Sequence, residues 1–183
     1  MGRKRGVEQE ELFYANEAAA AAEVTKMKDG ATHFAYKTEQ AVDLDTGVIV
    51  AITTQGGATG DTDSVSETLC AAGVSVAAQI ATATDDGKYL VNEAGVEELV
   101  TDKGYHSGPC LLAMAAMGMR TYISEPKKGR RKWQHKPEQQ AAVYANRRRV
   151  TGARGKRLLR RRGEFLERPF AHQYETGGQR GKT

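Results

Sequence analysis

The 183-residue sequence has few of the residues that build metal sites or disulfides, with only two cysteines and four histidines. Cys70 and Cys110 lie far apart in apolar, helix-like runs, and no second cysteine or histidine stands at the spacing of metal ligands. We therefore expect both cysteines to be buried small apolar residues, and we expect no zinc site. The sequence also lacks a run of the ~20 apolar residues that a membrane span requires. Its basic start leads into acidic residues instead of the apolar core of a signal peptide, which favours a cytoplasmic protein of one domain plus tails.

Charges of opposite sign are separated along the chain. Residues 1–119 carry 8 basic and 18 acidic side chains, whereas residues 120–183 carry 19 basic and 5 acidic ones. Clustered lysines and arginines gain affinity for phosphate backbones by releasing condensed counterions, so nucleic acid is the predicted partner. The alternative is a solvated basic surface, which is less favoured because so many like charges repel unless an anion is present.

Three stretches hold most of these basic residues, at 127–133, 147–149 and 156–162. A tryptophan within the first stretch is suited to stacking on an unpaired base. We predict contact with DNA for Lys127, Lys128, Arg130, Arg131, Lys132, Trp133, Arg147, Arg148, Arg149, Lys156, Arg157, Arg160 and Arg161.

Short periodic segments along the chain predict a mixed α/β fold. Two β-rich runs around an Asp/Gly turn indicate an antiparallel hairpin. An alanine-rich helix through the seventies follows, with Asp63 or Ser64 as its N-cap, and Pro137 suits the first position of a later helix. The predicted strands are 32–42, 48–54, 98–102 and 120–124, and the later helices are 108–118, 138–149 and 156–174.

Two carboxylates are candidates for metal chemistry. Asp102 ends a predicted strand, where open α/β sheets place their ligands. At 100° per residue, Glu167 lies near the flank of the apolar stripe of the last helix, whereas Glu164 lies opposite that stripe. Acids from a strand end and a late helix hold Mg²⁺ in two-metal phosphoryl-transfer sites, which normally use a third acid. The alternatives are a turn role for Asp102 before a glycine bend and surface ion pairs for both glutamates.

Short motifs occur in a fixed order over residues 25–178, among them Asp-Lys-Gly-Tyr at 102–105 and Glu-Arg-Pro-Phe at 167–170. Taken together, they resemble the C-terminal part of a bacterial insertion-sequence transposase of the DDE class. The other matching stretches are 25–30, 32–33, 36–37, 41–47, 60–62, 106–107, 125–127, 130–133, 143–149, 154–164, 171–172 and 176–178.

The resemblance implies a ribonuclease H-like mixed sheet with flanking helices, in which Asp102 and Glu167 are catalytic and hold Mg²⁺ or Mn²⁺. It also implies DNA at the ends of an insertion element as partner, and a transposase oligomer. In the family the first catalytic Asp stands on a strand upstream of an insertion, and this chain resembles the family only from within that insertion. We therefore expect a partial catalytic domain at 25–178 that lacks this central strand, between a peripheral segment at 1–24 and a tail at 179–183.

Three hypotheses follow for function. The first is a DDE transposase catalytic-domain fragment that does not catalyse transposition alone, because two carboxylates cannot hold both metals. The second is a noncatalytic DNA-binding remnant, whose binding would be independent of metal and steeply sensitive to salt. The third is a pseudogene product without a stable fold, which a noncooperative thermal melt would indicate.

Overall fold

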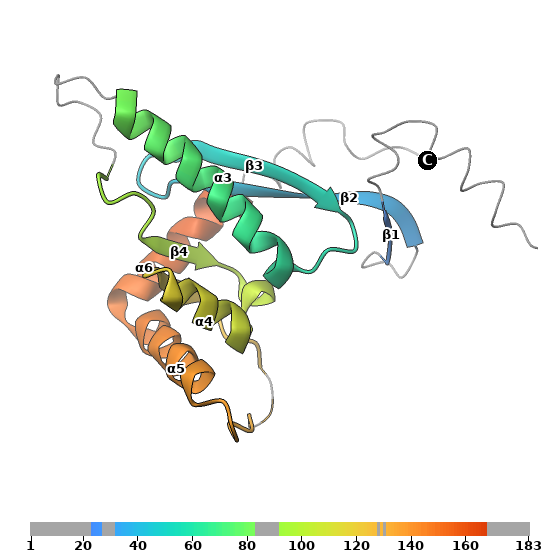
Figure 1. The fold of residues 1–183 in the computed structure, drawn as a ribbon, viewed down its shortest axis with the longest axis vertical. Coiled ribbons are helices and arrows are strands. Elements are labelled where there is room, and N and C mark those ends of the chain that lie inside the picture. The colour runs from blue at the N-terminus through green and yellow to red at the C-terminus, as the bar shows by residue number, and fades with distance from the viewer. Residues whose placement is uncertain (1–22, 27–31, 83–91, 128, 130, 168–183) are drawn as a thin grey trace, which may run out of the picture.

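The computed structural model describes residues 23–26, 32–82, 92–127, 129 and 131–167 (Figure 1). They form a mixed α/β unit, as the sequence predicts. The elements are β1 (Glu23–Lys26), β2 (Thr32–Val42), β3 (Ile49–Gly56), α3 (Asp61–Thr82), β4 (Glu98–Thr101), the 3₁₀ turn η1 (Lys103–Tyr105), α4 (Gly108–Ala116), β5 (Arg120–Ile123), α5 (Pro137–Thr151), α6 (Ala153–Arg162) and the π-helical turn η2 (Gly163–Glu167).

The described strands form two separate small sheets. One is antiparallel, with the order β1-β2-β3, and the other pairs β4 with β5 in parallel. The predicted hairpin is confirmed, and its turn is held by the Asp43 carboxylate, which accepts hydrogen bonds from the amides of Asp45 and Thr46 at 3.2 and 3.0 Å. Gly47 closes the turn at φ 78°, a left-handed conformation that glycine adopts without strain.

Helix α3 covers the hairpin and begins earlier than the sequence predicts. The Gly60 carbonyl already accepts hydrogen bonds from the amides of Asp63 and Ser64, so these two residues lie in the first turn and neither is the N-cap. Cys70 of this helix is exposed, which makes its predicted burial wrong, because its position faces away from the hairpin. Cys110 in α4 is buried as predicted, and burial raises the pKa of its thiol.

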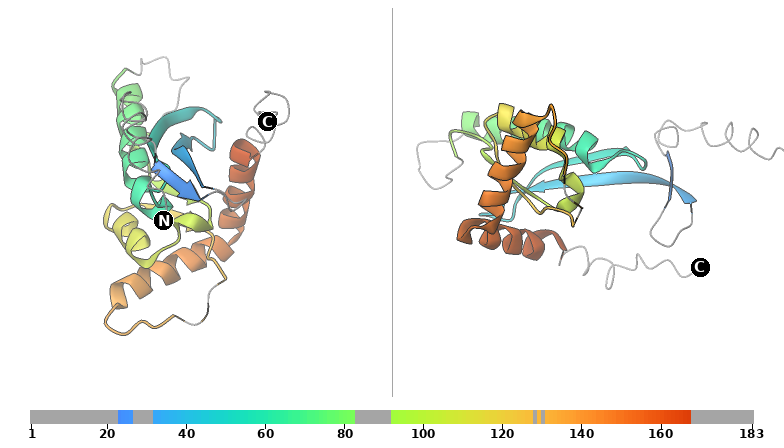
Figure 2. Two further views of the ribbon diagram at one scale, coloured as in Figure 1. Left: turned by 90° about the vertical axis from the view of Figure 1, so that its right-hand side faces the viewer. Right: turned by 90° about the horizontal axis from the view of Figure 1, so that it is seen from below.

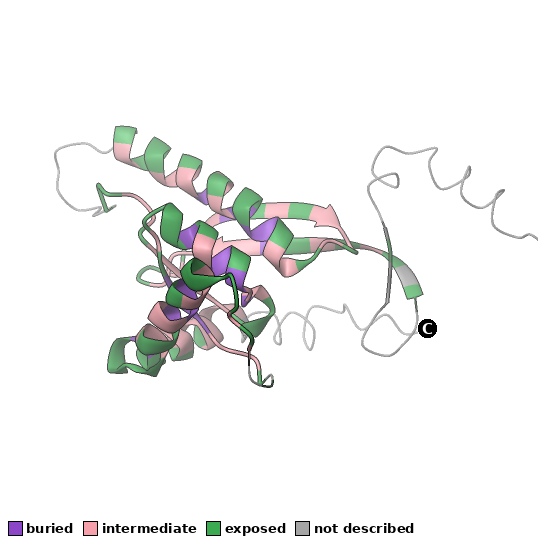
Figure 3. Cartoon of the chain, turned by 60° about the horizontal axis from the view of Figure 1, so that its bottom comes forward, coloured by how far each residue is buried: buried purple, intermediate pink, exposed green. Residues whose placement is uncertain are grey.

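By length and composition alone, α3 could cross a membrane. The sequence analysis expects no run of this kind, and that expectation is wrong for this helix. The buried residues of α3 are Ser64, Val65, Thr68 and Ala72, all within its first 12 residues, and the rest of the helix is intermediate or exposed (Figure 3). A single helix of this kind is weak evidence for a membrane span, because core helices of soluble proteins pass the same test, and a cytoplasmic location stays a prediction.

The core lies between the β4–β5 pair and the helices α3, α4 and α5. One cluster joins Leu111 of α4, Ile123 of β5 and Val143 of α5, and a second joins Val65 of α3 to Cys110 and Met114 of α4. Leu99 and Tyr105 contact both clusters, so β4 and η1 are held from both sides. Apolar burial at these positions fixes the end of β4 within the fold.

Helices α4, α5 and α6 follow the sequence prediction with shifted ends. The Ser107 side chain caps α4 by accepting a hydrogen bond from the Cys110 amide at 3.1 Å, and Pro137 opens α5. The last predicted helix, 156–174, starts three residues earlier, because Gly152 ends α5 and α6 begins at Ala153. Residues 168–174 of that prediction, and 1–22 of the predicted peripheral segment, lie outside the described residues.

Helices α3 and α6 lie on opposite faces of the hairpin (Figure 2). α6 is tied to both sheets through arginines. Arg154 donates to Glu98 of β4 at 2.6 Å, and Arg161 donates to the Asp45 carbonyl of the hairpin turn at 2.9 Å. The basic helix predicted to contact DNA therefore also bridges the two sheets.

Candidate functional site

A cluster of polar side chains gathers where β4 ends and the middle of β2 comes close to it. The carboxylate cluster, as we call it, consists of Lys37, Glu39, Asp61, Asp102 and Tyr105. Its members come from β2, the start of α3, the residue after β4, and η1. Only Asp102 was singled out by sequence as a site residue.

Glu39 is the buried centre of this cluster, with 6% of its surface exposed. Its Oε1 accepts hydrogen bonds from the hydroxyls of Ser64 and Tyr105, the latter at 2.8 Å, and its Oε2 accepts one from Thr68 at 2.7 Å. Burial by itself would raise the pKa of Glu39, but these hydrogen bonds and the Lys37 ammonium outweigh burial and hold the pKa below its usual range. Glu39 is therefore a carboxylate kept ionised inside the fold.

The Lys37 ammonium is the positive charge of the cluster. It lies 2.8 Å from Glu39 Oε1 and 2.7 Å from Asp61 Oδ1, and it donates to the Ser64 hydroxyl at 2.8 Å. Burial lowers the pKa of Lys37, but the hydrogen bonds to Asp61 and Glu39 prevail and raise it. For Tyr105, burial and the neighbouring Glu39 both raise the pKa of the phenol, so its hydroxyl stays a donor.

Asp61 and Asp102 approach each other around Gly104. A Cβ at position 104 would lie within 3.0 Å of both Asp61 Oδ2 and Asp102 Oδ1, so a larger residue there would push at least the Asp61 carboxylate aside. Asp102 Oδ1 accepts a hydrogen bond from the Gly104 amide at 2.8 Å and caps the 3₁₀ turn. The turn role that the sequence left open as an alternative is thus the one that these contacts show for Asp102.

A cavity of about 1550 Å³ separates the two sheets, and Asp102 lies on its border. Leu166 of η2 borders the same cavity, so the backbone just before Glu167 lies at this cavity too. The side chain of Glu167 lies outside the described residues, and its pairing with Asp102 stays a prediction. The position predicted for Glu167 assumes an α-helix with 100° per residue, but residues 163–167 wind as a π-helix, to which that angle does not apply.

The described residues do not by themselves fit a magnesium site. They contain no group of three or more Asp, Glu, His or Cys side chains that could hold a metal ion. Asp61 is ion-paired with Lys37, and one oxygen of Asp102 is taken up by the Gly104 amide.

The basic residues predicted to contact DNA divide into three groups in the structure. Four have their guanidinium groups bound within the fold: Arg131, Arg147, Arg149 and Arg161. Six are exposed and form no ion pair with another described residue: Lys127, Lys132, Arg148, Lys156, Arg157 and Arg160. Lys128 and Arg130 lie outside the described residues.

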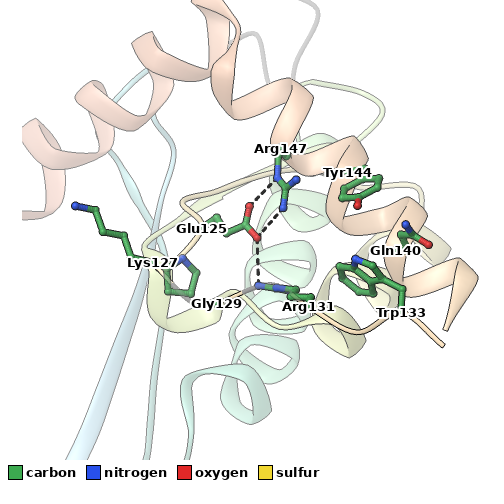
Figure 4. Close-up of a pocket in the computed structure, with 9 residues that line it drawn as sticks. Glu125, Lys127, Gly129, Arg131, Trp133, Gln140, Tyr144 and Arg147 are labelled. Atoms are coloured by element: carbon green, nitrogen blue, oxygen red, sulfur yellow. Dashed lines mark hydrogen bonds and ion pairs between the residues drawn. The ribbon is translucent and has the colours of Figure 1, made fainter. Parts of the chain in front are cut away.

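Glu125 holds two of the bound arginines at the edge of a pocket of about 720 Å³ (Figure 4). Arg147 binds its carboxylate through two hydrogen bonds at 2.8 and 3.0 Å, and Arg131 lies 3.5 Å from Oε1. The hydrogen bonds from Arg147 lower the pKa of Glu125 and so favour its ionised form. It neutralises part of the basic surface from within.

Trp133 borders the same pocket, but its ring takes part in the packing of the fold. Its ring packs on the core cluster of α4, β5 and α5 and meets Tyr144 edge-on, with ring centroids 6.0 Å apart. The Arg131 guanidinium lies 5.6 Å from the Trp133 ring centroid. Base stacking by Trp133 stays a prediction.

Sequence reasoning missed Lys37, Glu39 and Asp61 as site residues. The sequence contains one indication for the first two of these residues. Lys37 and Glu39 stand two positions apart on a predicted strand and therefore share one of its faces. Lysine and glutamate are seldom buried unless they are paired, so opposite charges on one face of a strand indicate an ion pair. Asp61 carried no comparable signal, since an acid in the first turn of a helix is ordinary.

No protein-family model, curated protein or solved structure matches the chain.

Proposed function

We propose that this chain is a partial ribonuclease H-like catalytic domain of a DDE transposase, which binds DNA and does not catalyse transposition alone. The observation that carries the proposal is the cavity between the sheets. It is bordered at one end by Asp102, directly after β4, and along one face by arginines of the basic helix α6. A carboxylate at a strand end beside a cationic helix suits a phosphodiester substrate.

Element order supports the ribonuclease H-like assignment. An antiparallel hairpin leads into a helix, and a β–α–β unit with a parallel strand pair follows. The cavity lies between β2 and β4, where the resemblance expects the missing central strand. In a ribonuclease H-like fold of this order, Asp102 has the position of the family's second catalytic Asp, and Glu167 follows on the last helical turn.

DNA binding in the proposal rests on the exposed cations of α5 and α6. Arg148, Lys156, Arg157 and Arg160 are exposed and form no ion pair among the described residues. Such cations gain free energy from phosphate contact without first breaking an internal pair. They serve to hold the duplex, while base-specific contacts require other groups.

The proposed lack of catalysis follows because too few carboxylate side chains are available to hold two metal ions. The described residues offer Asp102 beside Asp61, and Asp61 already pairs with Lys37. A two-metal site needs more carboxylate oxygens than these supply. The second candidate function, a noncatalytic DNA-binding remnant, is favoured by the contacts of Asp102, which stabilise a turn.

An assay with a labelled DNA end tests the proposal. We expect the wild-type chain to bind duplex DNA equally in Mg²⁺ and in EDTA, and to give no cleavage or strand transfer with Mg²⁺ or Mn²⁺. Asp102→Asn should leave binding unchanged. Strand transfer that disappears in Asp102→Asn would contradict the predicted inactivity, and absence of DNA binding would contradict the proposed function itself.

A further inference from the structure

The Lys37 ammonium is surrounded by oxygen atoms as a bound metal ion would be. An ammonium group has three N–H donors, and those of Lys37 have three close partners. Asp61 Oδ1 lies 2.7 Å from the nitrogen, and Glu39 Oε1 and the Ser64 hydroxyl lie 2.8 Å from it. The Thr59 carbonyl oxygen lies 3.5 Å from the same nitrogen. Four oxygens from β2 and from residues 59–64 therefore surround one positive charge.

These oxygens are of the kinds that Ca²⁺ binds. Calcium takes about six to eight oxygen ligands, from carboxylates, backbone carbonyls and water, in a flexible geometry. The shell around the Lys37 nitrogen offers the Glu39 and Asp61 carboxylates and the Thr59 carbonyl. No group of three acidic side chains converges among the described residues, so water would complete the ligand set and the affinity for Ca²⁺ would be low.

Fixed partners hold the shell in place around the nitrogen. Glu39 is buried, and the Thr68 and Tyr105 hydroxyls donate to its two oxygens at 2.7 and 2.8 Å, which holds its carboxylate in one orientation. The Asp61 side chain is 40% exposed and, like Lys37, lines the cavity between the sheets. An ion from solvent therefore has a path to this position.

The ammonium excludes a second cation from the same place. Two like charges a few ångströms apart repel each other, and the repulsion is strongest away from bulk water. The lysine side chain is tethered to β2, so its charge is present at a high effective concentration whatever ions are in solution. A divalent ion would have to displace an ammonium that has all three donors bound.

We propose that Lys37 is the resident cation of the carboxylate cluster. Its ammonium takes the position that a divalent metal ion would have among these oxygens, and it keeps the wild-type chain free of metal there. Removal of the ammonium leaves a weak calcium site. This explains why the described residues do not fit a magnesium site, and it rests on contacts within the fold, so it stands if the DNA function fails.

Thermal unfolding of Lys37→Ala with and without calcium tests the proposal. Alanine vacates the position of the ammonium and leaves Glu39 and Asp61 without their counter-charge. Weak calcium sites have a Kd of about 1 mM, so about 10 mM Ca²⁺ should raise the ratio of folded to unfolded variant about tenfold over EDTA. For a chain of this length the melting temperature should rise by about 3–6 °C. The wild type should show no rise.

Two control variants separate a calcium site from a general gain of negative charge. Lys37→Met removes the same charge, but its side chain ends in a methyl group of similar reach to the ammonium, so calcium should raise its melting temperature less than that of Lys37→Ala. Lys37→Ala combined with Asp61→Asn lacks one carboxylate of the shell and should show no rise. Titration calorimetry of Lys37→Ala should give about one Ca²⁺ per chain, with a Kd of about 1 mM.

Loss of folding does not prevent the test, because metal binding and folding are coupled. If Lys37→Ala is unfolded in EDTA, refolding on addition of Ca²⁺ supports the proposal, and failure to refold overturns it. An equal rise in the wild type or in either control variant also overturns it, because calcium would then bind elsewhere. So does the absence of any rise in folded Lys37→Ala. DNA binding enters none of these measurements.

Discussion

Alanine in place of Gly155 should destabilise the protein, whereas alanine in place of Gly73 should stabilise it. Gly155 is buried in the first turn of α6, where a Cβ would strike the Arg149 carbonyl oxygen of α5 and lie 2.9 Å from the Val150 Cα. Gly73 lies within α3, and a Cβ there would meet nothing within 4 Å. The two sites thus differ in contact although both are helical glycines.

The magnitudes follow from two opposed effects. A glycine-to-alanine change inside a helix lowers the entropy of the unfolded chain and favours folding by about 0.5–1 kcal/mol. Gly73→Ala has only this effect. At Gly155 the new methyl group overlaps backbone atoms, and such overpacking costs about 1–3 kcal/mol, so the net result is a loss of about 1–2 kcal/mol.

Urea unfolding followed by circular dichroism measures both variants against wild type. The midpoint of Gly73→Ala should rise and that of Gly155→Ala should fall, with the slope m unchanged in both, so that the shifts report stability. Equal stabilisation by the two changes would refute the close approach of α5 and α6 on which the placement of the basic helix depends.

Three further predictions concern single side chains. The folded pKa of Glu39 lies below its unfolded value of 4.5, so its ionised form adds stability above that pH and the contribution disappears as pH falls through the folded pKa. Glu39→Gln should therefore destabilise more at pH 7 than at pH 3 in urea unfolding; an equal loss at both would show that the charge has no role. The buried Asn146 side chain accepts a hydrogen bond from the Ile123 amide and donates one to the Ile123 carbonyl, at 3.0 and 2.8 Å. Asn146→Leu leaves both backbone groups unpaired and should cost about 2–4 kcal/mol in the same assay, and a neutral result would contradict a stabilising role for these two hydrogen bonds. Glu125→Gln should release Arg131 and Arg147 and make the slope of log K against log salt for DNA binding steeper by about 1–2, as fluorescence anisotropy would measure; an unchanged slope would place both arginines away from DNA.

Local patterns predicted most elements of the fold. The period-2 runs of the hairpin, Pro137 at the start of α5 and the apolar run of α4 each act through a few neighbouring residues, and each element is present. The ends of two helices differ from the predicted ones because backbone groups set these boundaries. The Gly60 carbonyl starts α3 early, and the chain turns at Gly152, so that α6 begins before the predicted residue.

The site was less accessible to sequence reasoning because it depends on contacts between distant segments. Tyr105 and Glu39 are 66 positions apart, and no local pattern predicts that a hydroxyl of η1 binds a carboxylate of β2. The same applies to Arg149, which looks like a free surface cation in sequence but donates to Thr121. The exposure of Cys70 depends on which face of α3 meets the hairpin, and a helix with apolar residues on several faces leaves that open.

Salt dependence of DNA binding tests the central claim most directly. The triple variant Lys156→Gln, Arg157→Gln, Arg160→Gln is compared with wild type on one duplex over a range of salt, and Lys103→Gln, outside the basic stretches, serves as the control. Since each phosphate contact adds about 0.9 to the slope of log K against log salt, the triple variant should lose about 2–3 from it. Lys103→Gln should keep the wild-type slope. A triple variant with the wild-type slope, or wild-type binding indifferent to salt, would contradict the proposal that α6 holds DNA.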